Sequence, residues 1–358
     1  MLICTLKIFN QIIQIYYLMK RHFFNLFAVA LLLMVTTVAC NKDKPATGLA
    51  LNPSIVMLVI DGTATLTATI YPHDAVDQTV TWISDNNAVA TVANGKVTAI
   101  AAGTATITAT VVTIEGNSFK ATSKVIVTHP AEPEMVKVKG GTFTMGCSDD
   151  ECYPFENPQR QVTLSDFRMA VYPVTQKQWK LIMDNNPSFT IGDNLPVEQV
   201  SWNDVQNFIT KLNEVSGKNY RLATEAEWEY AARGGDKSQG YKYSGSNDIN
   251  EVAWHAVDSS SRTQPVGMKK PNELGIYDMS GNVFEWVHDW YRDRYPSFSE
   301  IDPTGPATGG DFNTRVLRGG SWSTVARGCR VSFRISALPT ERLNLYGFRL
   351  VLPEPNLD

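Results

Sequence analysis

Small polar and apolar residues alternate along much of the stretch between residues 48 and 128. A period of two places every second side chain on the same face of a strand, and the Thr, Val and Ile that dominate here favour strands. Asn94-Gly95, just before one of the runs, is typical of a two-residue hairpin turn. Strands this short and this closely spaced predict an antiparallel sandwich. The alternating runs are residues 63–70, 79–83, 96–100 and 104–111.

Beyond residue 135 the pattern changes to a few helices separated by irregular segments. Thr175 and Gln178 form a capping box at the start of one predicted helix, and Ser201 starts a second. A third begins at Thr224 and ends at Gly234-Gly235. Apolar residues recur in the second helix at helical spacing and predict its buried face, which consists of Val205, Phe208, Ile209, Leu212 and Val215.

A basic, then apolar, then small-residue pattern at the N-terminus predicts an export signal over residues 1–39, with Met19 a candidate true start. The apolar run is short for a transmembrane helix, which needs about 20 apolar residues. Cys40 follows at the position of a lipidated cysteine, although Thr37 stands where leucine is usual. An ordinary cleaved signal peptide is the alternative. The pattern favours an envelope lipoprotein whose residues 40–47 are a lipidated tether to a membrane, with the outer membrane preferred and the protein facing the periplasm or the cell surface.

The composition of the chain limits what it binds. The net charge is −4, only 19% of residues are charged and no basic cluster stands out, which argues against nucleic acid. Cys147 and Cys152 are five apart in a polar loop, and in an oxidising compartment a disulfide between them is the simplest interpretation. A metal-binding pair is the alternative. Cys329 is then left over, and a buried inert thiol is its expected state.

Four segments of the strand-rich region match a known domain in sequence and order. They are residues 81–85, 89–92, 94–100 and 103–107. Together they resemble a bacterial immunoglobulin-like group 2 domain that covers residues 48–128. The resemblance implies an all-β immunoglobulin-like sandwich that serves as a spacer or an adhesive module, with Trp82 as a core anchor. A proline-bearing linker at residues 129–134 follows it.

Seven segments of the C-terminal region also occur in the order of a known family. Two of them are Arg221-Leu-Ala-Thr-Glu-Ala-Glu-Trp-Glu-Tyr-Ala-Ala-Arg-Gly-Gly235 and Gly275-Ile-Tyr-Asp-Met-Ser-Gly-Asn-Val-Phe-Glu-Trp286. The others are residues 140–146, 172–175, 196–202, 318–322 and 347–349. Residues 135–354 thus resemble the formylglycine-generating-enzyme, or sulfatase-modifying factor, family. The resemblance implies an α+β domain with the C-type-lectin-like fold, which is irregular and poor in regular elements.

Asp278 and Glu285 are two carboxylates seven residues apart, with Gly281 between them. Calcium prefers oxygen ligands and mixes carboxylates with backbone carbonyls, but this spacing alone is a weak signal. The family resemblance implies a structural calcium ion held by Asp278 and Glu285 and by the carbonyls of Gly281 and Val283. Regular elements are few beyond residue 236, so an ion is one candidate for what holds this region together.

The resemblance also implies an oxidase site, where two cysteine thiolates hold copper(I) because soft sulfur ligands favour that ion. Cys329 matches the second of these cysteines, and Ser321 matches an active-site serine. Thr324 stands where the first cysteine belongs. Its hydroxyl has no accessible pKa and is not a soft donor, so it does not replace a thiolate on copper(I).

These observations leave two hypotheses for the function. The favoured one is a non-catalytic envelope or surface lipoprotein whose C-terminal domain binds a glycan, a peptide or an envelope protein, through a pocket lined by Trp286, Trp290 and Trp322. The alternative is an active, copper-dependent formylglycine-generating oxidase that matures exported sulfatases. The alternative requires copper at Cys329 and at a second thiol.

Replacing Cys40 by Ser is expected to release the protein from membranes, because the lipid would be attached through that sulfur. Membrane and soluble fractions of cells that produce the wild-type and Cys40→Ser chains, compared by immunoblot, test this. Continued membrane association of the variant would refute lipidation at this position.

Overall fold

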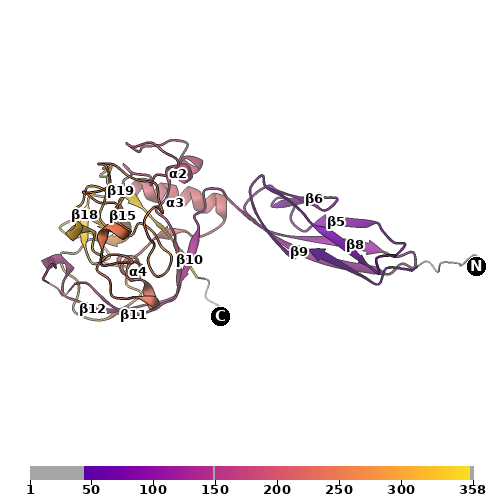
Figure 1. Ribbon diagram of the computed structural model, residues 1–358, viewed down its shortest axis with the longest axis horizontal. Coiled ribbons are helices and arrows are strands. Elements are labelled where there is room, and N and C mark those ends of the chain that lie inside the picture. The colour runs from indigo at the N-terminus through magenta and orange to yellow at the C-terminus, as the bar shows by residue number, and fades with distance from the viewer. Residues whose placement is uncertain (1–43, 148–149, 355–358) are drawn as a thin grey trace, which may run out of the picture. The chain divides into compact units, whose positions relative to one another are not determined.

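A computed structural model describes residues 44–147 and 150–354 of the chain (Figure 1). The predicted export signal and residues 40–43 of the tether, which include Cys40, lie outside these residues. Within the described ranges, no helix combines the length and the apolar character that a membrane crossing requires.

Residues 48–128 form nine strands and, as predicted, no helix within this fully described stretch. They pair into a four-stranded sheet in the order β2-β9-β8-β5, a three-stranded sheet β3-β7-β6 and the pair β1-β4. The β2-β9 pairing is parallel and the others are antiparallel. The strands are β1 (Gly48–Asn52), β2 (Ile55–Val59), β3 (Thr63–Thr65), β4 (Thr67–Tyr71), β5 (Val80–Ser84), β6 (Ala90–Ala93), β7 (Lys96–Ala99), β8 (Gly103–Val112) and β9 (Ser118–Thr128).

The period of two in the sequence reappears as alternating burial. Along β8 every second side chain, from Ala105 to Val111, is buried and its neighbours are partly exposed. Val97, Ile107 and Val125 form the centre of the core, against which Trp82 packs. The predicted run 63–70 is interrupted at Leu66, whose side chain is buried and whose N–H donates to the carbonyl of Gly95. The chain therefore passes from the β3 sheet to the β1-β4 pair at this residue.

The predicted hairpin turn at Asn94-Gly95 is confirmed. Ala93 pairs with Lys96, so the loop has two residues. Both have positive φ, 48° at Asn94 and 79° at Gly95, which is the backbone conformation that this pair of residues tolerates best.

The C-terminal domain consists of short strands and few helices, as Figure 1 shows. Three sheets have the orders β10-β13-β20-β14, β11-β12-β16 and β18-β17-β15-β19. The strands are β10 (Met135–Val138), β11 (Gly141–Met145), β12 (Arg160–Leu164), β13 (Phe167–Ala170), β14 (Arg221–Leu222), β15 (Phe284–Trp290), β16 (Glu300–Ile301), β17 (Arg315–Arg318), β18 (Arg334–Ala337), β19 (Tyr346–Phe348) and β20 (Leu350–Pro353).

The three predicted helices all form, and each begins with a capping box. Thr175, Ser201 and Thr224 are the N-caps, and each accepts a hydrogen bond from the backbone N–H three residues later. The predicted buried face of the second helix is right except at Val215, which is exposed. The helices are α2 (Gln176–Met183), α3 (Trp202–Ser216), α4 (Glu225–Ala232), α5 (Ile249–Val252) and the 3₁₀ turns η1 (Pro154–Glu156), η2 (Gly235–Lys237) and η3 (Ala326–Cys329).

Aromatic side chains from distant segments meet in the core of this domain. Trp179 and Phe208 stack with ring centroids 5.2 Å apart, and Phe348 meets both edge-on. Ala131, from the segment predicted as a linker, is buried in the same cluster. Next to it, Glu132 accepts a hydrogen bond from the hydroxyl of Tyr220. Part of residues 129–134 thus packs on the C-terminal domain.

Replacing Gly95 by Ala is expected to destabilise the immunoglobulin-like domain more than replacing Gly116, the matched control. Both glycines have positive φ, so alanine costs roughly 1–2 kcal/mol at either. At Gly95 a Cβ would also lie 2.6 Å from the carbonyl oxygen of Leu66, whereas at Gly116 nothing lies within 4 Å. Native-state hydrogen exchange of the β6–β8 amides measures both losses, and equal losses would contradict the steric argument.

Candidate functional site

Cys329 is the last residue of η3 and is completely buried. Its neighbours in the core are apolar, among them Val252 and Tyr243. Gly320 packs directly against it, because a Cβ there would lie 2.6 Å from the sulfur. Burial raises the pKa of the Cys329 thiol to about 12. Since the thiolate is the nucleophile and metal ligand, this raised pKa disfavours both tasks at neutral pH.

Thr324 and Ser321 form a closed turn next to this thiol. The hydroxyl of Thr324 accepts a hydrogen bond from the N–H of Ser321 at 3.0 Å, and the two hydroxyl oxygens are 2.8 Å apart. The N–H of Thr324 returns a bond to the carbonyl of Ser321, and the sulfur of Cys329 lies 3.9 Å from the Thr324 carbonyl. The structure thus brings the three family positions together. The threonine hydroxyl holds the turn, and one protonated sulfur with hard oxygen neighbours does not fit copper(I).

Asp278 lies in the segment predicted to bind calcium. Its side chain is buried and one carboxylate oxygen accepts a hydrogen bond from the N–H of Gly267 at 2.7 Å. Burial raises the pKa of Asp278 to about 6. Gly281 follows with φ of 80°, and a Cβ there would lie 2.2 Å from the carbonyl oxygen of Trp254. The turn at Gly281 therefore requires glycine for packing, whether or not an ion is bound.

Glu285, the second predicted carboxylate ligand, is paired with a cation that belongs to the protein. Both of its oxygens accept hydrogen bonds from the Arg349 guanidinium, at 2.8–3.1 Å. The indole N–H of Trp228 donates to one of them at 2.7 Å. A carboxylate offers about four acceptor positions, and these bonds use them. Of the predicted set Asp278, Gly281, Val283 and Glu285, the last therefore does not fit calcium in this arrangement, because Arg349 and Trp228 already use its carboxylate oxygens.

The three tryptophans predicted to line a pocket are not grouped in one. Trp286 is buried in the core, where its indole N–H donates to the carbonyl of Val200. Trp322 donates to the carbonyl of Asn344. Trp290 covers the guanidinium of Arg315, 3.5 Å from the ring centroid. The prediction of a pocket was wrong at Trp286, since that side chain packs inside the domain.

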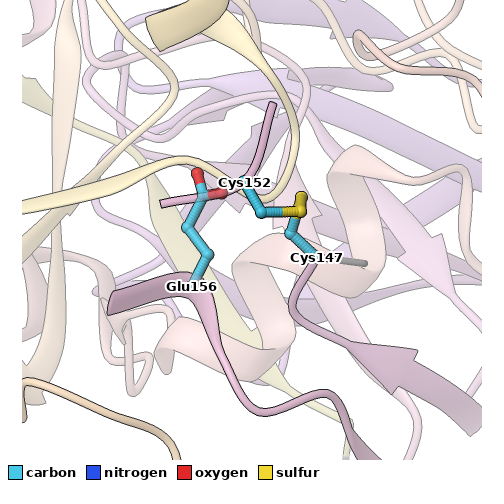
Figure 2. Close-up of side chains that lie close together, drawn as sticks. All are labelled: Cys147, Cys152 and Glu156. Carbon is cyan, nitrogen blue, oxygen red and sulfur yellow. A yellow bond between two sulfur atoms is a disulfide. The ribbon is translucent and has the colours of Figure 1, made fainter. Parts of the chain in front are cut away.

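Cys147 and Cys152 are joined by a disulfide, and the carboxylate of Glu156 lies beside it (Figure 2). Sequence spacing alone left a metal-binding pair as the alternative. In this structure the two sulfurs are bonded to each other, so neither is available to complete a copper site with Cys329.

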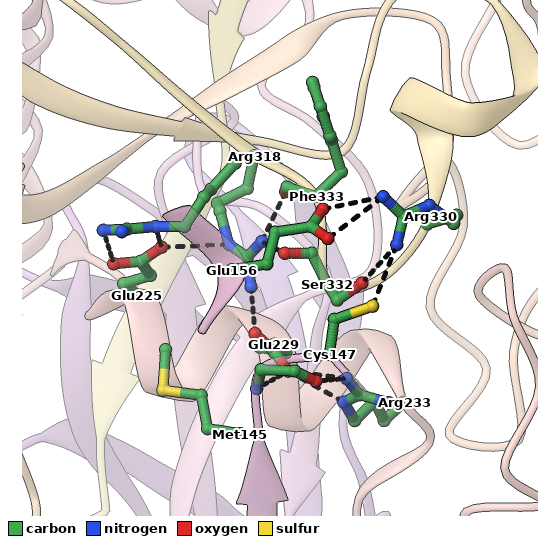
Figure 3. A network of polar contacts seen from close by, with 12 residues as sticks. Met145, Cys147, Glu156, Glu225, Glu229, Arg233, Arg318, Arg330, Ser332 and Phe333 are labelled. Atoms are coloured by element: carbon green, nitrogen blue, oxygen red, sulfur yellow. Dashed lines mark hydrogen bonds and ion pairs between the residues drawn. The ribbon is translucent and has the colours of Figure 1, made fainter. Parts of the chain in front are cut away.

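Buried ion pairs that were not predicted from the sequence connect distant segments of the domain, and Figure 3 shows part of them. Glu225 and Glu229 lie one turn apart on α4, and both are buried. Their segment matched the family, but no single-sequence signal identifies partners so distant along the chain. The pairs are Arg318 with Glu229, Arg334 with Glu225, Arg330 with Glu156 and Arg349 with Glu285.

Comparison with known families confirms both resemblances. The family model for the Sulfatase-modifying factor enzyme 1-like domain matches residues 122–353, and that for the Bacterial Ig-like domain (group 2) matches residues 45–125.

Individual relatives and a solved structure match the same region. The Chaperone protein LppX of Paenibacillus barcinonensis is 35% identical over 252 residues, which cover 56% of this chain and 82% of that protein. The Formylglycine-generating enzyme of Thermomonospora curvata is 30% identical over 289 residues, which cover 60% and 92%. The structure of Treponema denticola variable protein 1 superposes with a TM-score of 0.57 at 30% identity, covering 69% of this chain and 99% of that one.

Replacing Glu285 by Gln is expected to lower the free energy of unfolding by about 3–5 kcal/mol, because Arg349 is left buried without its counter-charge. The exposed Glu214→Gln on α3 is the matched control and is expected to change little. Thermal unfolding of all three proteins is measured in calcium and in a chelator. The wild-type melting temperature is expected to be the same in both, and a calcium-dependent melt that Glu285→Gln abolishes would contradict the argument against a calcium site.

Proposed function

The chain belongs to the sulfatase-modifying factor enzyme 1-like family, and from its substituted site we propose that it is a non-catalytic member. Its C-terminal domain binds a partner at the cell envelope, and the immunoglobulin-like domain is the spacer that precedes it. The observation that carries the proposal is the pairing of one protonated thiol, Cys329, with a threonine hydroxyl that holds a turn.

The chemistry of the site argues against oxidation, and one relative supports a binding role. The family's oxidase chemistry needs two thiolates on copper(I), and Thr324 supplies a hard oxygen instead. The relative that is named a chaperone points to handling of other proteins rather than to oxidation. A peptide or an envelope protein is therefore the preferred partner, and a glycan is the alternative. A lipid on Cys40, as the sequence predicts, would hold the domain at the membrane surface.

A polar cleft on the C-terminal domain offers a place for such a partner. Its volume is about 360 Å³, within the range of clefts that hold small ligands or parts of peptides. Arg221 and Glu227 form a two-bond ion pair on its wall, at 2.6 and 2.7 Å, and His288 and Asp302 also line it. Polar groups of both signs favour a ligand that is itself polar. Arrays of peptides and of glycans, probed with the protein, distinguish the two classes.

The wild-type protein is expected to bind no copper(I) and to form no aldehyde on a sulfatase-motif peptide in the presence of oxygen. Thr324→Cys would place a second thiol at the family position beside Cys329, so this variant is expected to gain copper(I) binding. Thr324→Ser keeps a hydroxyl and is the matched control, which is expected to bind none. Copper(I) is measured by competition with a chelating dye, and aldehyde by mass spectrometry.

The result that would overturn the proposal is aldehyde formation by the wild-type protein that disappears in Cys329→Ser. It would instead establish the alternative, an active copper-dependent oxidase that matures exported sulfatases.

A further inference from the structure

The disulfide between Cys147 and Cys152 lies against a buried guanidinium, and we propose that it is redox-active. It exchanges with external thiols, with Cys152 as the sulfur that is attacked and Cys147 as the leaving thiolate. The inference is independent of the function proposed above, since it uses none of the same residues.

Arg330 holds the sulfur of Cys147 in a fixed arrangement (Figure 3). One terminal nitrogen of its guanidinium donates to the Cys147 sulfur at 3.2 Å and to the hydroxyl of Ser332 at 3.1 Å. The other donates to both oxygens of Glu156, at 2.8 and 3.1 Å, and the Nε donates to the carbonyl of Arg327. All five N–H groups are used, and Arg330 is buried. The sulfur contact is therefore part of a locked network.

A cation in this position favours the thiolate of Cys147 once the disulfide opens. Cysteines beside Arg or Lys ionise at lower pH, and a sulfur that ionises more readily is the better leaving group in thiol–disulfide exchange. The same chain contains the opposite case, because the buried and apolar surroundings of Cys329 raise the pKa of that thiol to about 12. Arg330 is what distinguishes the two environments.

The two sulfurs also differ in access. Cys147 is buried, whereas Cys152 is partly exposed, so an incoming thiolate reaches Cys152 first. One accessible sulfur and one stabilised sulfur are the asymmetry that directed exchange requires.

The carboxylate of Glu156 partly offsets the positive charge that Arg330 presents to Cys147. The Arg330–Glu156 pair also favours thiol exchange over metal binding at this site. Its carboxylate and the two sulfurs lie within 4.8 Å of one another, a grouping that could hold a metal after reduction (Figure 2). A metal would have to displace the guanidinium from both Glu156 and Cys147, and a fixed positive charge opposes that. The other charged groups near the disulfide are also paired. Glu229 accepts from the N–H of Gly146 and Arg233 donates to its carbonyl, while Lys242 forms an ion pair with Glu151.

The exchange is balanced with an external thiol as reductant. Its thiolate attacks the sulfur of Cys152, the Cys147–Cys152 bond breaks, and the electron pair of that bond leaves on Cys147 beside Arg330. A second external thiolate then attacks the external sulfur of the mixed disulfide and releases Cys152, which takes a proton from water. The protein gains two electrons and two external thiols become one disulfide.

The first test measures whether the native protein is reduced without unfolding. The oxidised wild-type chain is treated with increasing dithiothreitol, quenched by alkylation and analysed by peptide mass mapping. The expected rate rises in proportion to the thiol concentration. A rate that is independent of thiol and equal to the rate of global unfolding, measured by hydrogen exchange, would overturn the proposal, since the disulfide would then be a purely structural bond.

The second test identifies the attacked sulfur. Variants that each lack one cysteine of the disulfide are treated with oxidised glutathione. Cys147→Ser is expected to carry one glutathione on Cys152, whereas Cys152→Ser is expected to carry little on Cys147. The buried Cys329 in the same chain is the internal control and is expected to stay unmodified. Preferential modification of Cys147 would overturn the assignment of roles.

The third test separates charge from structure. In the Cys152→Ser background, the pH midpoint of alkylation of Cys147 by iodoacetamide, a reagent much smaller than glutathione, is measured with Arg330→Gln and with Glu156→Gln. Both changes break the same buried pair, but loss of the cation is expected to raise the midpoint and loss of the carboxylate to lower it, by about one pKa unit each. Shifts in the same direction would show that the network acts only by packing and would overturn the proposal.

Discussion

Buried arginine–glutamate pairs are the constraint on which the C-terminal domain depends. Arg318, Arg330, Arg334 and Arg349 are all at most 1% exposed, and each is paired with a glutamate from a distant segment. Burying these charges costs several kcal/mol each, and removing one partner typically costs about 3–5 kcal/mol more than leaving the pair intact. The pairs are therefore better at specifying an arrangement than at adding stability. A domain with short helices and short strands benefits from that, because the guanidinium groups of Arg330 and Arg349 use all five of their donors in this arrangement.

The same pairs explain why the fold does not depend on the residue at the family's first cysteine position. The segment that carries Ser321, Thr324 and Cys329 begins at Arg318 and ends shortly before Arg334, and both arginines are fixed on α4 through Glu229 and Glu225. Arg330 holds the middle of the segment to Glu156. The backbone of the site is therefore positioned by charges that take no part in oxidation. A cysteine can be exchanged for threonine within this segment while its course is retained, and the threonine hydroxyl then closes a local turn.

The elements predicted from the sequence were those governed by neighbouring residues. The alternating strands, the Asn94-Gly95 hairpin and the three capped helices depend on contacts within a few positions, and all of them form. The contacts that the sequence did not predict arise where a distant residue decides. Glu285 has the spacing of a metal ligand, but Arg349, 64 residues later, takes its carboxylate. Trp286 was predicted to line a pocket, but in the folded chain its indole N–H donates to the carbonyl of Val200, 86 residues earlier. Leu66 interrupts a strand because its N–H donates to the carbonyl of Gly95, a contact that the local sequence pattern does not predict.

Cys329 and Arg330 are adjacent in the chain, yet they give two cysteines opposite electrostatic surroundings. The backbone around Cys329 turns its sulfur into an apolar cluster, where ionisation is unfavourable. The next side chain turns the other way and brings a guanidinium to Cys147, at a distance of 183 residues in sequence. Reactivity of a thiol follows its local charge and not its position in a family alignment. In this chain burial therefore disfavours ionisation of the family-matching cysteine, whereas the cation that would favour a thiolate lies beside the disulfide, at Arg330.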